Sequence, residues 1–256
     1  MMMWFVARRL FWMILSIGVG ACFIEIWNLV AQARFVSPVF LPGPDKAWSA
    51  LMAGLTDGEM LDKTVRTVER MVYGWLLASL IGIVLGAIVG VSQTARAYVE
   101  PTLEFLRPLP ASALIPVGVA ILGLTDSMVL AVIALGALWP MLLATVQGFA
   151  AVEPRLYHVS RALGLSRRDV VWKIVLPSAM PDILAGMRVG LTIALILAVV
   201  GEMIASRPGL GQVILLAARS FQSADLYAGV ILLGVVGYVS GLLLSLVESR
   251  LLRWRV

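Results

Sequence analysis

Few side chains in this sequence could perform covalent chemistry. Cys22 is the only cysteine and His158 the only histidine, so the chain cannot build an internal disulfide, a zinc cluster or a Cys-His nucleophile pair. The lysines follow Asp45, Asp62 and Trp172, so none completes the Gly-Lys pair of a phosphate-binding loop. We therefore predict no catalytic residue, no metal site and no cofactor, and energy for any driven process would come from elsewhere.

Three charged side chains lie inside otherwise apolar runs, where an ionisable group is a functional hypothesis by default. Glu25 lies toward the predicted outer end of its run, one helical step from Asn28, where a carboxylate can reach water. Arg188 lies close to the predicted cytoplasmic end of another run, and Glu202 lies at the opposite end of that run. A long arginine side chain can extend to the interface. This structural interpretation is favoured for Glu25 and Arg188, although an ion-coupled carrier would use all three groups.

The composition places these residues in a membrane. Hydrophobic residues make up 61% of the 256 residues and charged residues 14%, with a mean hydropathy of +0.96, which excludes an ordinary soluble domain. Each helical crossing needs about 20 residues, so the apolar runs leave little room for a folded domain outside the bilayer. We predict one all-α integral membrane domain over residues 1–256, with six spans at about residues 10–30, 71–91, 101–124, 128–149, 183–204 and 227–247.

Orientation in the bilayer explains the formal net charge of +5. With both termini inside, twelve Lys and Arg residues lie on the cytoplasmic side, seven lie outside and Arg188 lies in a span. Cytoplasmic loops carry such an excess of positive charge. Membrane lipid is therefore a predicted partner, and nucleic acid is not.

Small residues predict how the second span packs. Glycines recur along it at every fourth or eighth position, at Gly74, Gly82, Gly86 and Gly90. Small residues on one helix face let another backbone approach closely, so we expect packing first and lining of a pathway second. The amphipathic segment 45–69 before this span predicts a helix at the outer surface.

The third span is rich in proline, at Pro101, Pro108, Pro110 and Pro116. Prolines inside a span free backbone carbonyls that other groups must satisfy, and broken spans tend to lie at the pathway of a transporter. This span is the one most favoured to line a pathway. A kinked helix buried in the bundle is the alternative.

A polar insert, residues 153–182, separates the fourth and fifth spans. Pro154 suits the first turn of a new helix, and Pro177 and Pro181 are expected to end whatever lies between. Inside these limits apolar residues recur at roughly helical spacing with basic residues between them. Gly164 interrupts the pattern, so we predict two short amphipathic helices joined at residues 164–166 and lying along the membrane surface. A basic loop held by lipid charge is the alternative.

The insert resembles the cytoplasmic signature of the permease subunits of ATP-binding-cassette (ABC) importers. The resemblance rests on Gly164, on Ile174 ten residues later and on Leu176-Pro177. The signature usually begins with Glu-Ala-Ala, where this chain has His158-Val159-Ser160. Other motifs resemble the sulfonate, taurine, nitrate and bicarbonate branch of this family: Leu41-Pro42-Gly43-Pro44, Arg107-Pro108-Leu109-Pro110 leading into Ile115-Pro116, Gly201-Glu202-Met203-Ile204, Gly209-Leu210-Gly211, and Ser223-Ala224-Asp225 with Tyr227-Ala228-Gly229.

The resemblance implies the type I importer permease fold with six transmembrane helices. In that fold the insert is a cytoplasmic pair of coupling helices that sits in a cleft of the ATPase subunit. The implied coupling residues are Arg155, His158, Ala162, Gly164, Leu165, Ile174, Leu176 and Pro177. The implied pathway residues are Pro110, Pro116, Glu202 and Met203.

The resemblance also implies a transport subunit without its own ATPase site, and not an enzyme. It would form the pathway for a small anionic solute, such as a sulfonate, taurine or nitrate, delivered by an external, periplasmic binding protein. The implied assembly is a homodimer with two ABC ATPase copies in the bacterial inner (plasma) membrane, with both termini cytoplasmic. Closure of the ATPase on nucleotide would pull two inserts together and turn the pathway from inward-open to outward-open.

Two other functions compete with this one. A stand-alone ion-coupled secondary transporter would work without ATP. An intramembrane enzyme is disfavoured, because the one histidine lies in a surface loop with no matching nucleophile.

Overall fold

The computed structural model describes residues 2–106 and 110–255, in which every regular element is a helix. Arg107, Pro108 and Leu109 of the predicted proline motif lie outside the described residues. The chain divides into two compact units: residues 1–61 with 213–232, and residues 62–212 with 233–256. Each unit is described by itself.

The first unit contains α1 (Met2–Gln32), α2 (Pro44–Thr56), most of α10 (Leu210–Arg219) and the start of α11 (Ser223–Leu251). The ring of Trp27 stacks on Tyr227 at 5.4 Å between centroids, and its indole nitrogen donates to the carbonyl of Pro42 at 3.0 Å. Nothing in the apolar stretch Leu15–Gln32 is buried. Its side chains are therefore available to lipid.

The segment 45–69 is helical as predicted, but it is divided between two helices. Helix α2 ends at Thr56, and α3 begins at Glu59 and continues without interruption to Val91. Gly58 between them has φ +77°, a conformation that glycine adopts at no steric cost. The helix of the second span therefore starts twelve residues before the apolar run at Met71. The apolar run does not indicate this start, because the first turns of the helix are amphipathic and carry charge.

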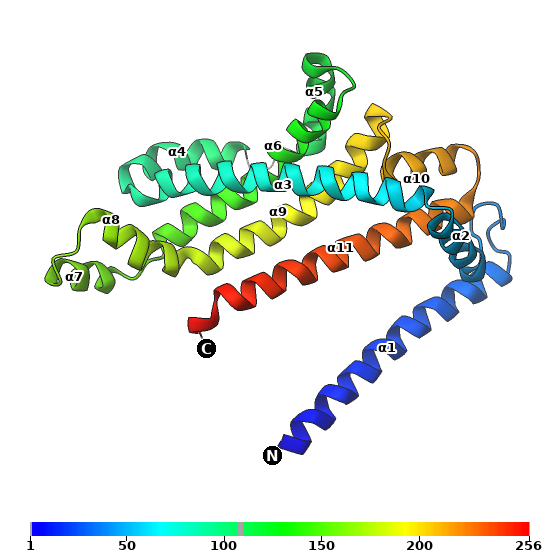
Figure 1. The fold of residues 1–256 in the computed structure, drawn as a ribbon, viewed down its shortest axis with the longest axis horizontal. Helices are drawn as coiled ribbons and strands as arrows, with labels where there is room; N and C mark the ends of the chain where they lie inside the picture. The colour runs from blue at the N-terminus through cyan, green and yellow to red at the C-terminus, as the bar shows by residue number, and fades with distance from the viewer. Residues whose placement is uncertain (1, 107–109, 256) are drawn as a thin grey trace. The chain divides into compact units, whose positions relative to one another are not determined.

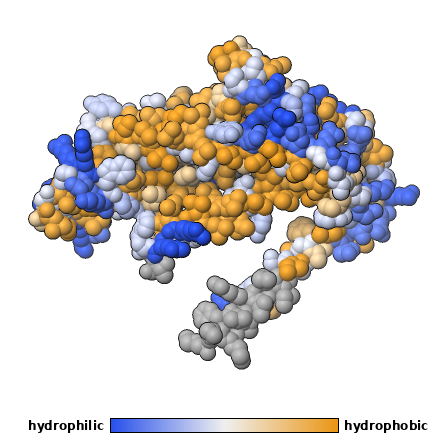
Figure 2. Space-filling view, in the orientation of Figure 1, coloured by the Kyte–Doolittle hydropathy of each residue, from blue (hydrophilic) through white to orange (hydrophobic). Residues whose placement is uncertain are grey.

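The second unit is built around α3, α6 (Asp126–Ala150) and α9 (Leu176–Ala205). The second unit also contains α4 (Gln93–Leu106), α5 (Ile115–Leu122) and the rest of α11, from residue 233 on, and Figure 1 labels each of these helices. Met71, Met128, Ile133 and Met141 are almost fully buried in the core. Figure 2 shows hydrophobic side chains along the middle of these helices and hydrophilic ones at both ends, at α7–α8 and at the opposite end.

The glycines of α3 pack against α6, as predicted. A Cβ built at Gly86 would lie 2.6 Å from the Cβ of Thr145, and one built at Gly90 would lie 2.6 Å from the Cβ of Phe149. Such distances are shorter than side chains tolerate, so only glycine allows this approach. The indole nitrogen of Trp75 adds a bond from α3 to α9, to the carbonyl of Met187 at 2.9 Å.

The third predicted span is divided. Helix α4 ends at Leu106, and the next described helices are η1 (Ala111–Leu114) and the eight-residue α5. The two pieces meet at 83°, so the described residues offer five helices able to cross a membrane, or six if this bent pair is one span. The predicted span 101–124 is not one continuous helix, because Pro110 is extended and Pro116 lies in the first turn of a new helix.

The prolines at the end of the insert do not stop the helix, contrary to the prediction. Helix α8 (Arg167–Val170) continues through a π-helical turn, η2 (Val171–Val175), into α9, so one helical stretch runs from Arg167 to Ala205. Pro177 removes the donor for the carbonyl of Lys173. In the π turn, the amide of Leu176 instead donates to the carbonyl of Val171, five residues earlier, which is one way a helix accommodates a proline.

Candidate functional site

The insert contains α7 (Pro154–Ala162), a tight turn and the start of the α8–α9 stretch. Gly164 in the turn has φ +65°, and nothing within 4 Å would meet a side chain there. The hydroxyl of Ser166 caps α8 by accepting from the amide of Asp169 at 3.2 Å. The predicted glycine turn between two short helices is confirmed, although the second helix continues into the span.

Four of the eight predicted coupling residues are exposed, and the other four are half-buried. Arg155, His158, Ala162 and Gly164 are exposed. Leu165, Ile174, Leu176 and Pro177 are half-buried. A small apolar core of Phe149, Val152, Val175, Ala179 and Ile183 holds the insert against the ends of α6 and α9.

The exposed face of the insert combines apolar and basic side chains. Leu163 and Trp172 are each 69% exposed, and Val159 is 52% exposed. Asp169 and Glu153 are paired locally, with Lys173 at 2.6 Å and Arg155 at 3.6 Å. Among the described residues, no acidic partner meets Arg161, Arg167 or Arg168. The face therefore has apolar centres with unpaired positive charge around them.

A hollow of about 500 Å³ lies beside this face, between the two insert helices and the end of α3. Its lining includes Val91, Tyr157, Arg161, Arg167 and Val175. The hollow places an apolar floor next to two guanidinium groups.

A larger cleft of about 710 Å³ opens along α6 and α9. Gly136 and Gly186 line its floor, and Ser112, Trp139 and Gln147 are the side chains there that can donate hydrogen bonds. Of the four predicted pathway residues, only Pro110 is part of this lining; Pro116, Glu202 and Met203 are not. The cleft is mostly apolar, with a few polar groups able to orient a solute.

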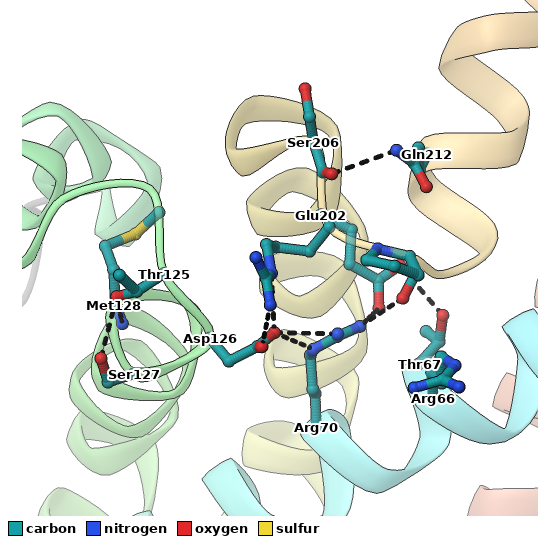
Figure 3. Close-up of polar contacts among 12 residues, drawn as sticks. Arg66, Thr67, Arg70, Thr125, Asp126, Ser127, Met128, Glu202, Ser206 and Gln212 are labelled. Carbon is teal, nitrogen blue, oxygen red and sulfur yellow. Dashed lines mark hydrogen bonds and ion pairs between the residues drawn. The ribbon is translucent and has the colours of Figure 1, made fainter.

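Glu202 lies at the end of α9 opposite the insert, with 0% of its surface exposed. Its carboxylate accepts from the hydroxyl of Thr67 at 2.9 Å, from Arg70 at 2.9 Å and from the amide of Gly211 at 3.0 Å. Figure 3 shows Arg70 of α3 between Glu202 and Asp126 of α6. The carboxylate is fully surrounded by donors from its own chain.

Asp126 joins a second arginine to this group. Arg70 binds it at 2.9 Å, and Arg207 donates its Nε to it at 3.1 Å and also pairs through Nη2. The hydrogen bond and the charge of Asp126 raise the pKa of Arg207 above its ordinary value. Thr67, Arg70 and Asp126 were not predicted as site residues, although Arg70 and Asp126 both border an apolar run, which was the available signal.

A second charge inside a span, Arg188, also has a partner. Arg188 of α9 pairs with Glu248 of α11 within the second unit. The predicted interfacial role of Arg188 therefore includes a specific acidic partner that sequence spacing did not indicate. Neither Arg188 nor Glu202 is a lone buried charge of the kind that an ion-coupled carrier would use.

Comparison with known proteins identifies the fold and the family. Residues 78–254 match the family model of the binding-protein-dependent transport system inner membrane component. Among solved structures, the chain is similar to the inward-facing MetNI methionine ABC transporter, with a TM-score of 0.65 at 18% identity over 78% of this chain and 98% of that one.

Curated relatives match almost end to end. The chain is 32% identical to SsuC of Bacillus subtilis, whose name assigns it provisionally to aliphatic sulfonate transport, over 92% of this chain and 85% of the relative. It is 29% identical to the taurine transport system permease protein TauC of Escherichia coli, over 97% and 94%, and 28% identical to the nitrate import permease protein NrtB of Leptolyngbya laminosa, over 89% and 83%. The chain thus belongs to the binding-protein-dependent inner membrane components, the permease subunits of ABC importers.

Proposed function

We propose that this permease carries a small anionic solute and is driven through its insert by a separate ATPase subunit. The observation that carries the proposal is the unbroken helical stretch from Arg167 to Ala205. It begins at the exposed turn of the insert and then forms one wall of the cleft, with Gly186, Val189 and Ile196. A displacement of the insert would therefore reach the cleft wall without crossing a loop.

The surface of the insert suits a protein partner. Leu163 and Trp172 offer apolar anchors, and arginines surround them. Aromatic and arginine side chains are the residues most enriched where proteins bind one another. The ATPase would bind here, at the predicted coupling residues Arg155, His158, Ala162 and Gly164, and its closure on nucleotide would move the insert.

The assembly we propose has two permease copies, two ATPase copies and one external binding protein, with lipid around the spans. The cleft along α6 and α9 is open on one side, and a second copy would complete it. Both termini would be cytoplasmic, on the same side as the insert. Native mass spectrometry of the complex extracted from membranes would give the copy numbers, and cysteine labelling from each side would give the orientation.

The solute class is proposed from the relatives and from the cleft. The matched relatives are named for taurine, nitrate and bicarbonate transport, and all three solutes carry an anionic group. Ser112, Trp139 and Gln147 can donate hydrogen bonds to such a group without binding it too tightly to release. The ligand that co-purifies with the partner binding protein, followed by ATP-dependent uptake of that ligand in vesicles, would test the class.

Substitutions at Gly164 would test the coupling role. Asn and Asp have nearly the same shape, and both tolerate the positive φ of this residue better than other side chains do. Gly164→Asn should keep most of the coupling, whereas Gly164→Asp adds a negative charge to a basic docking face and should uncouple ATP hydrolysis from uptake by about tenfold. No described residue lies within 4 Å of a Cβ built at this position, and the Asn variant controls for the bulk of the rest of the side chain. Unchanged uptake in the Asp variant would contradict the assigned turn.

A further inference from the structure

The contacts around Glu202 form one connected group, which we call the Glu202 junction: Thr67, Arg70, Asp126, Glu202, Arg207 and residues 208–211. The carboxylate binds α3 through the hydroxyl of Thr67 and the guanidinium of Arg70. Arg70 continues to α6 through Asp126 at 2.9 Å. Three helices of the second unit are therefore joined by one buried carboxylate and one arginine.

The segment 208–211 closes around the same carboxylate. Arg70 donates to the carbonyl of Pro208 at 2.7 Å, and the amide of Leu210 donates to Thr67 at 2.8 Å. A side chain at Gly209 would run into the Glu202 carboxylate, and one at Gly211 would run into the carbonyl of Val199. These two glycines therefore allow the backbone to lie directly against the carboxylate and the helix that bears it.

The charges of the junction are balanced, and the pair at its centre is inaccessible to a solute, because the side chains of Glu202 and Arg70 are 0% and 11% exposed. The junction contains two arginines and two carboxylates, and Glu202 itself is completely buried. Opening the junction would leave a carboxylate and a guanidinium buried without partners, which is far less favourable than keeping the pair together. The cleft along α6 and α9 has none of these charged side chains in its lining.

We propose that the Glu202 junction is a permanent joint, which holds the ends of α3, α6 and α9 together throughout the transport cycle. Glu202 and Arg70 act as positioning residues, and neither is a ligand of the solute. The α8–α9 helix then moves at the insert while its other end stays attached to α3 and α6. The proposal concerns motion within one chain and uses the proposed ATP-driven function only for its test.

A disulfide across the α6 and α9 ends of the junction tests whether they separate. A Cβ built at Gly201 lies 3.5 Å from the Cβ of Val129, at the lower limit of the usual range of about 3.5–4.5 Å. The double variant Gly201→Cys/Val129→Cys would be made with Cys22→Ser, which removes the native thiol. The single-cysteine variants, oxidised in parallel, control for effects of the oxidant.

Disulfide formation is first measured in the assembled complex, with no nucleotide and with ATP trapped by vanadate. A permanent joint predicts the same extent of cross-linking in both conditions, and ATP-dependent taurine uptake that changes less than twofold when the bond forms. The proposal is overturned if trapping reduces cross-linking several-fold, or if uptake stops on oxidation and returns on reduction. If the unmodified chain shows no ATP-dependent uptake of taurine, taurine is not its solute, and the cross-linking comparison still decides the joint.

A double-mutant cycle separates positioning from charge chemistry. Arg70→Gln alone leaves the buried Glu202 carboxylate without a charged partner and should lower uptake at least tenfold. Glu202→Gln alone leaves Arg70 paired with Asp126 only and should lower uptake several-fold. The double variant keeps a neutral hydrogen-bonded pair and should recover to within about threefold of the unmodified chain. Asp126 still has Arg207 in all of these variants. Glu69→Gln, at an exposed neighbouring position of α3, is the matched control and should change nothing. A double variant as inactive as either single variant, at equal amounts in the membrane, would refute the positioning role.

Discussion

At the residue scale, Gly209 is tightly constrained, because its backbone lies against the Glu202 carboxylate. Gly209→Ala should lower the thermal midpoint of the purified permease, since the added methyl group runs into a buried carboxylate that three hydrogen bonds hold in place. Forcing a methyl group into a packed site costs about 1–3 kcal/mol. Differential scanning fluorimetry in detergent would measure the shift.

Gly234→Ala in α11 is the matched control for this prediction. Nothing in the chain lies within 4 Å of a Cβ at Gly234, and alanine is the better helix former by about 0.5–1 kcal/mol. The control should therefore be neutral or slightly stabilising. Equal losses for both substitutions would mean that the close approach at Gly209 has no energetic consequence.

The junction also shows what residue types alone cannot predict. Glu202 stands out in the sequence as a carboxylate in an apolar run, but its partner Arg70 is 132 positions away. No periodicity connects the two, because the contact is fixed by how α3 and α9 pack in three dimensions. The same holds for Arg188 and Glu248, whose positions differ by 60.

At the element scale, the glycines of α3 were predictable, because spacing along a single helix is enough to define a face. Gly86→Val should strongly reduce the amount of folded permease, since the new side chain would overlap Thr145 and the carbonyl of Leu142 on α6. The measurement is the monodisperse fraction on size-exclusion chromatography after extraction. Gly241→Val has open space around it, so it should behave like the unmodified chain and serves as the control.

The boundaries of elements were predicted less well where proline is involved. Proline has a fixed φ and no amide donor, and these two properties predict that the helix ends at Pro177 and Pro181. A single π turn at Val171–Val175 is enough to keep the helix going, and local sequence patterns carry no signal for such a turn. In this case the error concerns function as well, since the unbroken helix joins the insert to the cleft wall.

At the scale of the whole molecule, hydropathy and motif spacing were sufficient for the fold class and the family. The positions of the apolar runs predicted the spans around α1, α3, α6, α9 and α11, and those helices are present. Composition could not predict the angle of 83° in the proline-rich third segment, because a free backbone carbonyl can be satisfied in several geometries. It also could not predict which apolar face meets lipid and which meets a second copy, since both environments favour the same side chains.

The last prediction concerns how the whole permease recognises its ATPase, and it decides between a docking insert and a basic loop held by lipid. Replacing Arg161, Arg167 and Arg168 together by Gln should weaken binding of the ATPase at least tenfold and flatten its dependence on salt, because these charges lack acidic partners in the described chain. Arg250→Gln/Arg253→Gln removes positive charge elsewhere on the predicted cytoplasmic side and is the control. The permease would be reconstituted into vesicles of purely zwitterionic lipid and into vesicles containing anionic lipid. Binding of the ATPase would be measured as the amount that floats with each kind of vesicle. If the triple variant loses binding in both kinds of vesicle while the control does not, the insert binds protein; a loss confined to anionic vesicles, shared by the control, would instead mean that lipid charge holds the loop.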